Sequence, residues 1–199
     1  MVRTQVGIYT IVITLFVAGV YILECVIKND YKKQTCYWAM LVVYISAVLW
    51  FTLFSRQMQS ERIMLQVPFA SYFSAHQDYL KNVAAAAKDG TITAVERIRA
   101  FLYGYNWLIL NTFLFIPYGV LNPGVFLKVK KTNLLLYGIL GSAIIELVQY
   151  VFKLGCFDID DVIQNTIGVC IGLLLSTLLR RNGMKCELVA GYSEEQRDG

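Results

Sequence analysis

Residues 134–152, LLLYGILGSAIIELVQYVF, decide the fold of this chain. The stretch is mostly apolar and contains one ionisable acid, Glu146. A helix that crosses a bilayer needs about 20 consecutive, mostly apolar residues, and this stretch is close to that length. It therefore predicts a membrane-spanning helix that carries a single acid within it.

Four further stretches have the same character. They comprise residues 4–27, which Glu24 alone interrupts, and residues 34–55, 100–127 and about 162–179. Hydrophobic residues make up 57% of the chain and charged residues only 16%, whereas a soluble domain usually has roughly 25% charged residues. The sequence thus predicts an all-α, polytopic membrane bundle of about five transmembrane helices. The first stretch is too long for a signal peptide, so we expect it to be a retained helix.

The basic residues lie in three short groups beside these stretches: Lys28, Lys32 and Lys33; Lys128, Lys130 and Lys131; and Arg180, Arg181 and Lys185. With five spans, all three groups fall on the same side of the membrane, and the positive-inside rule makes that side cytoplasmic. We therefore expect a plasma-membrane protein with its N-terminus outside and its C-terminus in the cytoplasm. Charge placed in this way argues against binding to nucleic acid.

The segment 56–99 would lie outside, and it is too long for a simple connection. Aromatic and aliphatic residues recur at helical spacing from Phe69 to Val83, which predicts an amphipathic helix at the outer interface. Thr93 and Glu96 have the spacing of a capping box, so we expect one helix to begin there and to continue into the membrane as the third span. The predicted regions are an N-terminal helix with a basic loop (1–37), a membrane domain (38–180) and a polar, disordered tail (181–199).

Polar residues share one face on each of the last two spans. Gly138, Ser142, Glu146 and Gln149 are four, four and three residues apart, which places them along one side of a helix. The fifth span has a matching face made of Asp161, Asn165, Gly168 and Gly172. Its two glycines form a GxxxG pair, which allows close helix packing. Ionisable groups inside a span are costly and usually functional, so the two faces predict a polar pocket.

Other polar residues are expected to join this pocket. Asp158, Asp160 and Asp161 crowd the start of the fifth span, where the helix macrodipole stabilises acids. Their oxygens could hold a divalent cation, although Asp160 could also be an ordinary N-cap. Arg56 leaves the second span on the outer side, where it either pairs with these acids or extends to the surface. The predicted outward-facing pocket consists of Arg56, Asn111, Glu146, Gln149, Asp158, Asp160, Asp161 and Asn165.

Three motifs resemble the signature of the VanZ-like family. They are Asn111-Thr-Phe-Leu-Phe-Ile-Pro117-Tyr-Gly119, Ser142-Ala-Ile-Ile-Glu146-Leu-Val-Gln149 and Asp158-Ile-Asp160-Asp161-Val-Ile-Gln-Asn165-Thr-Ile-Gly168. Their order and spacing agree with the family, and Arg56 and Pro68-Phe69 resemble its earlier elements. The resemblance covers about residues 38–180. The family is named for a bacterial membrane protein associated with low-level resistance to the glycopeptide teicoplanin, so the resemblance implies a protein of the cell envelope.

Three functions are compatible with these features. The first is an envelope protein, in contact with membrane lipids and able to form homo-oligomers, that binds a lipid-linked cell-wall precursor or a glycopeptide in the outward-facing pocket. The second is an intramembrane enzyme for a lipid or polyprenyl-linked substrate, with Glu146 as acid or base and Asp161 as its catalytic partner. The third is a small transporter, for which the sequence shows no internal repeat.

Overall fold

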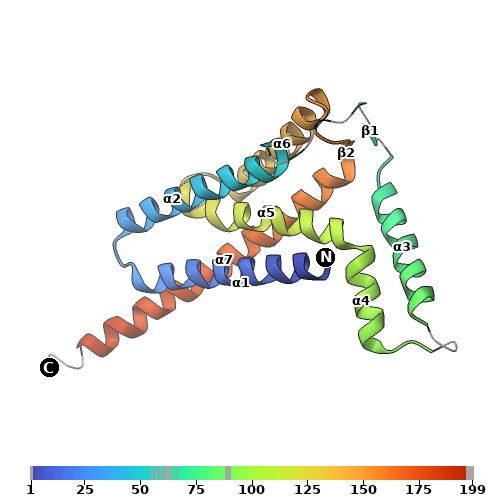
Figure 1. Cartoon of the computed structure of the whole chain (residues 1–199). Helices are drawn as coiled ribbons and strands as arrows, with labels where there is room; N and C mark the ends of the chain where they lie inside the picture. Colours follow the sequence, from blue (N-terminus) through green and yellow to red (C-terminus); the bar gives the residue numbers. More distant parts are fainter. Residues whose placement is uncertain are drawn as a thin grey trace.

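The computed structural model shows a bundle of helices with a helix pair lying across one of its ends (Figure 1). It describes residues 2–54, 56, 58, 60, 64–65, 67–87 and 91–195, with side chains for 11–54, 56, 58, 60, 67–87 and 91–182. The described helices are α1 (Val2–Val26), α2 (Asp30–Leu49) with the π-helical turn η1 (Trp50–Phe54), α3 (Ala70–Ala86), α4 (Ala94–Gly104), α5 (Asn106–Val125), α6 (Lys131–Val151) and α7 (Ile159–Glu195). Two short strands, β1 (Met64–Leu65) and β2 (Phe157–Asp158), pair in parallel.

The long helices have the dimensions of membrane spans. Four of the described helical segments are long and apolar enough to cross a bilayer, namely α2 with η1, α5, α6 and α7 as far as Asn182. The described side chains of α1 form a shorter apolar helix, Ile11–Val26, within a continuous helix of 25 residues. Large apolar side chains point outward along these helices, as contact with lipid requires. The prediction of an all-α membrane bundle is confirmed.

The two ends of the bundle differ in charge. We call one the basic end, because it holds the segments 28–33, 128–131 and 180–181, and the other the acidic end, because it holds Glu146 and residues 158–161. At the basic end, Lys33 Nζ and Arg180 Nε lie 3.3 Å and 3.5 Å from the carboxylate of Glu24. The three basic groups thus share one end, as predicted, and the side of the membrane that this end faces stays a prediction.

Helices α5 and α7 cross with their backbones in close contact, because glycines line the crossing. A Cβ atom added to Gly168 would lie 2.2 Å from the carbonyl oxygen of Thr112, and one added to Gly172 would lie 2.2 Å from that of Ile116. A Cβ atom added to Gly119 of α5 would lie 2.8 Å from the Cα atom of Gly172, so these two glycines also contact each other. The GxxxG pair therefore has the packing role that its spacing predicts.

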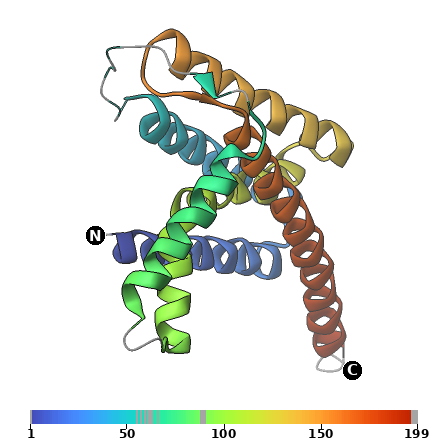
Figure 2. The same ribbon diagram turned by 90° about the vertical axis from the view of Figure 1, so that its right-hand side faces the viewer.

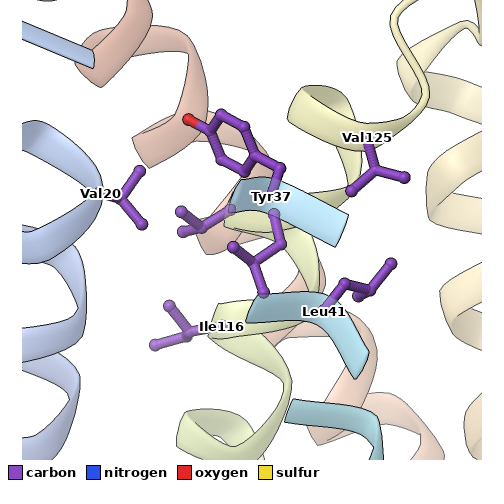
Figure 3. Packing of buried hydrophobic residues seen from close by; sticks show 7 residues of the cluster. Val20, Tyr37, Leu41, Ile116 and Val125 are labelled. Carbon is purple, nitrogen blue, oxygen red and sulfur yellow. The ribbon is translucent and has the colours of Figure 1, made fainter. Parts of the chain in front are cut away.

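An apolar cluster beside this crossing joins α1, α2 and α5. Its fully or nearly fully buried members are Val20, Tyr37, Leu41, Ile116, Val120, Leu121 and Val125. Figure 3 shows the Tyr37 ring among these side chains, with its hydroxyl oxygen pointing away from them. The hydroxyl donates a hydrogen bond of 2.6 Å to Glu24 Oε1. Tyr37 thereby connects the apolar core to the polar groups of the basic end.

The segment before the third span forms a helical hairpin of α3 and α4. The predicted amphipathic helix is present as α3, and Phe69, Phe73 and Leu80 of its predicted stripe are exposed. The capping box of Thr93 and Glu96 is also present, at the start of α4. In Figure 2, the acidic end faces the viewer and α3 lies in front of the spans. This position fits the predicted interfacial helix, whose contact with a membrane surface stays a prediction.

The expected single helix from Thr93 into the third span is wrong. Helix α4 ends at Gly104, Tyr105 leaves helical geometry with φ −97° and ψ 13°, and α5 begins at Asn106. A Cβ atom on Gly104 would lie 2.7 Å from the backbone nitrogen of Tyr79, so this glycine permits close packing of α4 on α3. Because α4 is held against α3, the chain must turn before it enters the bundle.

The end of the chain also differs from expectation. Helix α7 continues to Glu195, whereas disorder was predicted from residue 181. Adding residues to an existing helix is far easier than nucleating a new one, and residues 183–195 contain no proline. The predicted disorder therefore does not apply up to Glu195, and residues 196–199 lie outside the described part of the chain.

Candidate functional site

The polar face of α6 is buried against the other helices. Gly138, Ser142, Glu146 and Gln149 are all buried, which confirms the face that their spacing predicted. Gln149 Nε2 donates to the carbonyl oxygen of Thr52 over 2.9 Å. That carbonyl lies in η1, where the π-helical turn interrupts the regular hydrogen-bond pattern of α2. Gln149 therefore joins α6 to the end of the second span.

The matching face of α7 meets α6 through an amide. Asn165 Nδ2 donates to Ser142 Oγ over 2.8 Å, and both side chains are buried. Asn165 Oδ1 is also buried but has no hydrogen-bond partner within the described part of the chain. The predicted pairing of the two faces is thus present, and it leaves one amide oxygen free to accept a hydrogen bond.

Asp160 does not face the pocket. It is fully buried, and its two carboxylate oxygens accept hydrogen bonds from the backbone nitrogens of Phe69 (2.6 Å) and Ser71 (2.9 Å). These amides belong to the start of α3, where the first turn of a helix has no partners of its own. Asp160 is therefore a cap for α3, a helix distant in sequence, rather than for the helix on which it lies.

Asp158 completes this attachment of α3. Its Oδ2 accepts from Ser71 Oγ over 2.7 Å, and its Oδ1 accepts from the backbone nitrogen of Asp160 over 2.9 Å. Its own backbone nitrogen donates to Glu146 Oε2 over 3.3 Å. Asp158 and Asp160 thus form a structural link between α3, α6 and α7, which we call the α3 clamp.

Asp161 and Glu146 are the two carboxyl groups that remain for other partners. Asn111 Nδ2 donates to Asp161 Oδ1. This hydrogen bond joins the third span to the fifth, beside the polar face of the fourth. Glu146 is 4% exposed and lines the same small cavity as Asp161. Among the described residues, one donor reaches each of these two carboxyl groups, whose oxygens can accept several hydrogen bonds, so part of this capacity stays available.

Arg56 reaches the site without pairing directly with an acid. Its charge acts on Glu146 and Asp161, but no ion pair joins it to a carboxylate within the described residues. Its Nη1 lies 2.8 Å from the position of a Cβ atom on Gly155, so a side chain at Gly155 would collide with it. Of the two alternatives for Arg56, the described residues thus show no direct ion pair with an acid, and the guanidinium lies exposed at the edge of the site.

Two adjacent cavities open at this end. The larger has a volume of about 660 Å³, and residues of α3 form part of its wall. Its lining includes Arg56, Asn111, Asp158 and Asp161. The smaller has about 150 Å³ and reaches Glu146, Gln149 and Asn165. Arg56, Asn111 and Asp161 line both cavities. The structure thus brings together seven of the eight predicted pocket residues, and Asp160 is the one excluded.

Several lining residues were not predicted as part of the site. They include Ser71, Ser74 and Asp78 of α3, Trp107 of α5 and Gln164 of α7. Gln164 follows Asp161 by three residues, so helical spacing alone would have placed it on the same face. The sequence did not indicate the α3 residues as part of the site, because they line the cavity only when the α3 clamp holds α3 in place.

Gln164 adds a second buried acceptor. Its Oε1 has no hydrogen-bond partner in the part of the chain that the structure describes. The same side chain lies near the hydroxyl of Tyr72 on α3. Burial raises the pKa of that hydroxyl, and the charge of Asp160 adds to the effect. The site therefore offers carboxylate and amide oxygens in excess over donors.

The three aspartates do not form a cation site. Within the described residues, no group of three His, Cys, Asp or Glu side chains is placed to hold a metal ion. The reason is visible in the clamp, since the oxygens of Asp158 and Asp160 accept hydrogen bonds from α3 and from the backbone. The possible divalent cation is thus not supported by the arrangement of these side chains.

Comparison with known proteins agrees with the motifs. The chain is 27% identical to Protein VanZ of Enterococcus faecium over 143 residues, which cover 72% of this chain and 74% of that protein. No solved structure matches the chain. The family model described as VanZ/LLP1 matches residues 41–180, a region that contains η1, the α3 clamp and both cavities. The chain therefore belongs to the VanZ/LLP1 family.

Proposed function

We propose that this protein binds, from the outer side of the cell membrane, the polar head of a lipid-linked or cell-wall molecule in the cavities at the acidic end. By binding that molecule, the protein would contribute to glycopeptide resistance of the teicoplanin type. The proposal combines the membership of the VanZ/LLP1 family with the geometry of the site. It also requires a definite orientation in the membrane.

The charge at the two ends supports that orientation. The basic end holds the three Lys- and Arg-rich segments, and such segments stay on the cytoplasmic side during insertion. The cavities lie at the opposite end, so they would open outward. A cavity of about 660 Å³ is within the range of small-molecule sites, roughly 300 to 1,000 Å³.

One observation carries the choice of ligand: the surplus of buried acceptors. Asp161 and Glu146 line the same small cavity, and the buried amide oxygens of Asn165 and Gln164 have no donor among the described residues. Leaving buried polar groups unpaired is costly, so a bound molecule that donates hydrogen bonds would stabilise the site. Hydroxyl groups of sugars and ammonium groups are such donors. Trp107, which is 74% exposed at the rim, offers an apolar face for a ring.

Binding measurements test this function. The purified protein in lipid nanodiscs is titrated with a polyprenyl-linked cell-wall precursor and with teicoplanin. We expect binding of at least one of them, and a loss of about tenfold in Asp161→Asn, because one lost charge-assisted contact is equivalent to about 1.4 kcal/mol. Asp30→Asn is the matched control, since it removes one negative charge at the other end. No binding of either probe, together with unchanged susceptibility after deletion of the gene, would disprove the proposal.

The burial of Glu146 beside Asp161 favours a second function. Glu146 lines the smaller cavity and could transfer a proton to or from a lipid or polyprenyl-linked substrate held there. Comparing lipid extracts of cells that carry the native protein or Glu146→Gln tests this enzymatic function. A substrate that accumulates only with Glu146→Gln would support it, and identical lipid profiles would exclude it.

A further inference from the structure

A second polar cluster lies at the basic end, far from the cavities described above. Glu24 of α1 is 6% exposed and accepts from the Tyr37 hydroxyl over 2.6 Å. The same carboxylate faces Lys33 Nζ at 3.3 Å and Arg180 Nε at 3.5 Å. Three helices, α1, α2 and α7, thus contribute to one charged centre.

A cavity of about 200 Å³ lies next to this centre. Glu24, Lys33, Tyr37 and Arg180 line it, and Asp30, Gln34, Gly124 and Leu127 complete its wall. A side chain at Gly124 would collide with the Tyr37 ring, whose nearest atom lies 2.5 Å from the Cβ position. The Arg180 guanidinium lies over the same ring, 5.8 Å from its centroid. Tyr37 is therefore held between Gly124 and Arg180, and the cavity has a fixed wall.

The charges favour an anion in this cavity. Glu24 is a single buried carboxylate, but it faces two cations. Arg180 Nε is buried and has no hydrogen-bond partner among the residues that the structure describes. The second acid of the wall, Asp30, is exposed in the first turn of α2, where the macrodipole stabilises it. The segments of the basic end carry further positive charge on Lys28, Lys32, Lys128, Lys130, Lys131 and Arg181, which do not line the cavity.

The position of the cavity identifies the source of the anion. It lies at the basic end of the spans, and the apolar side chain of Leu127 in its wall is 57% exposed. In a bilayer, the ends of the spans are the part that meets the lipid head groups. Basic pockets between membrane helices are suited to anionic lipid head groups. We propose that this cavity binds the phosphate of an anionic phospholipid, of the phosphatidylglycerol type, through Lys33 and Arg180.

This site is not a feature of the family match. The match covers residues 41–180, so Glu24, Lys33 and Tyr37 lie outside it and Arg180 is its last residue. The site is also independent of the proposed function, because it lies at the opposite end of the spans and shares no residue with the acidic end. A bound lipid would connect α1 to the family domain.

Native mass spectrometry tests the proposal with the full chain. The protein is purified in detergent and offered phosphatidylglycerol or phosphatidylethanolamine at equal concentration. We expect the native protein to retain phosphatidylglycerol at least fivefold more, and the variant Lys33→Gln/Arg180→Gln to lose this preference. The matched control is Lys128→Gln/Lys130→Gln, which removes the same charge at the same end without touching the cavity wall; it should keep the preference.

Other outcomes would overturn the proposal. Equal losses in both double variants would mean that only general charge attraction is present. No preference of the native protein for phosphatidylglycerol would exclude the site even if the first variant failed to fold. Displacement of the lipid by millimolar inorganic phosphate would show that free phosphate, and not a phospholipid, is the ligand.

Discussion

Asp160 on α7 accepts a hydrogen bond of 2.6 Å from the backbone nitrogen of Phe69, 91 residues earlier in the chain. A second bond from Ser71 completes the cap of α3. The wall that α3 gives to the large cavity thus depends on an acid that does not line the cavity itself. This separates residues that shape the site from residues that face a ligand.

Removing this cap should loosen α3 alone. In Asp160→Ala we expect the amides of α3 to exchange hydrogen about 10 to 100 times faster, because hydrogen bonds to a charged group contribute about 1.5 to 3 kcal/mol. The spans should keep their protection, which hydrogen exchange with mass spectrometry resolves by segment. Asp78→Ala is the control on α3, since Asp78 is exposed and its ion-pair partner is Lys81 of the same helix. Equal protection of α3 in the native protein and Asp160→Ala would contradict the capping role.

The contact between Asn111 and Asp161 should be energetically coupled. Both side chains are partly buried, and a charge-assisted hydrogen bond joins them across α5 and α7. A double-mutant cycle with Asn111→Ala and Asp161→Asn should give a coupling energy of about 1 to 2 kcal/mol, in the range found for residues in contact. Unfolding of the four proteins in mixed micelles measures it. A coupling energy indistinguishable from zero would show that the two residues do not interact in the membrane.

The glycine crossing of α5 and α7 offers a direct test of the fold. Gly172→Ala would place a Cβ atom 2.2 Å from the carbonyl oxygen of Ile116, so the two backbones must separate. We expect a loss of about 1 to 3 kcal/mol in unfolding free energy, as for other overpacked sites. Gly141→Ala is a matched control in α6, because a Cβ atom there has no neighbour within 4 Å. If both substitutions have the same effect, the close crossing is not present.

Local periodicity in the sequence was enough to predict much of this structure. Spacings of three and four residues placed Glu146 and Gln149 on a buried face, and the GxxxG pair at a close crossing, because both depend only on helix geometry. The cap of α3 by Asp160 could not be found in this way, since its two partners are far apart in sequence and share no period. The turn at Gly104 was missed for a similar reason, because it follows from packing of α4 on α3.

Charge at the helix ends was predicted less well than burial. The sequence left open whether Arg56 pairs with the acids or extends to the surface; it lies at the cavity edge, where the absence of a side chain at Gly155 leaves room for it. Glu24 was noted as an acid in an apolar stretch, but its partners come from α2 and from Arg180 of α7. Such long-range ion pairs depend on tertiary structure and leave no pattern along the chain.

The contact of Arg56 with Gly155 leads to a prediction about the site that leaves every charged residue in place. Gly155→Ala adds only a methyl group, but that group would lie 2.8 Å from Arg56 Nη1 and 3.3 Å from Gln149 Oε1. Because the arginine side chain is flexible and exposed, it should move away at little cost to stability, under about 1 kcal/mol. Its positive charge would then leave Glu146 and Asp161. Ligand binding at the acidic end should therefore change by the same factor in Gly155→Ala as in Arg56→Gln, and the double variant should show no further change. Additive effects in the double variant would mean that Gly155 acts on the site by a route other than Arg56.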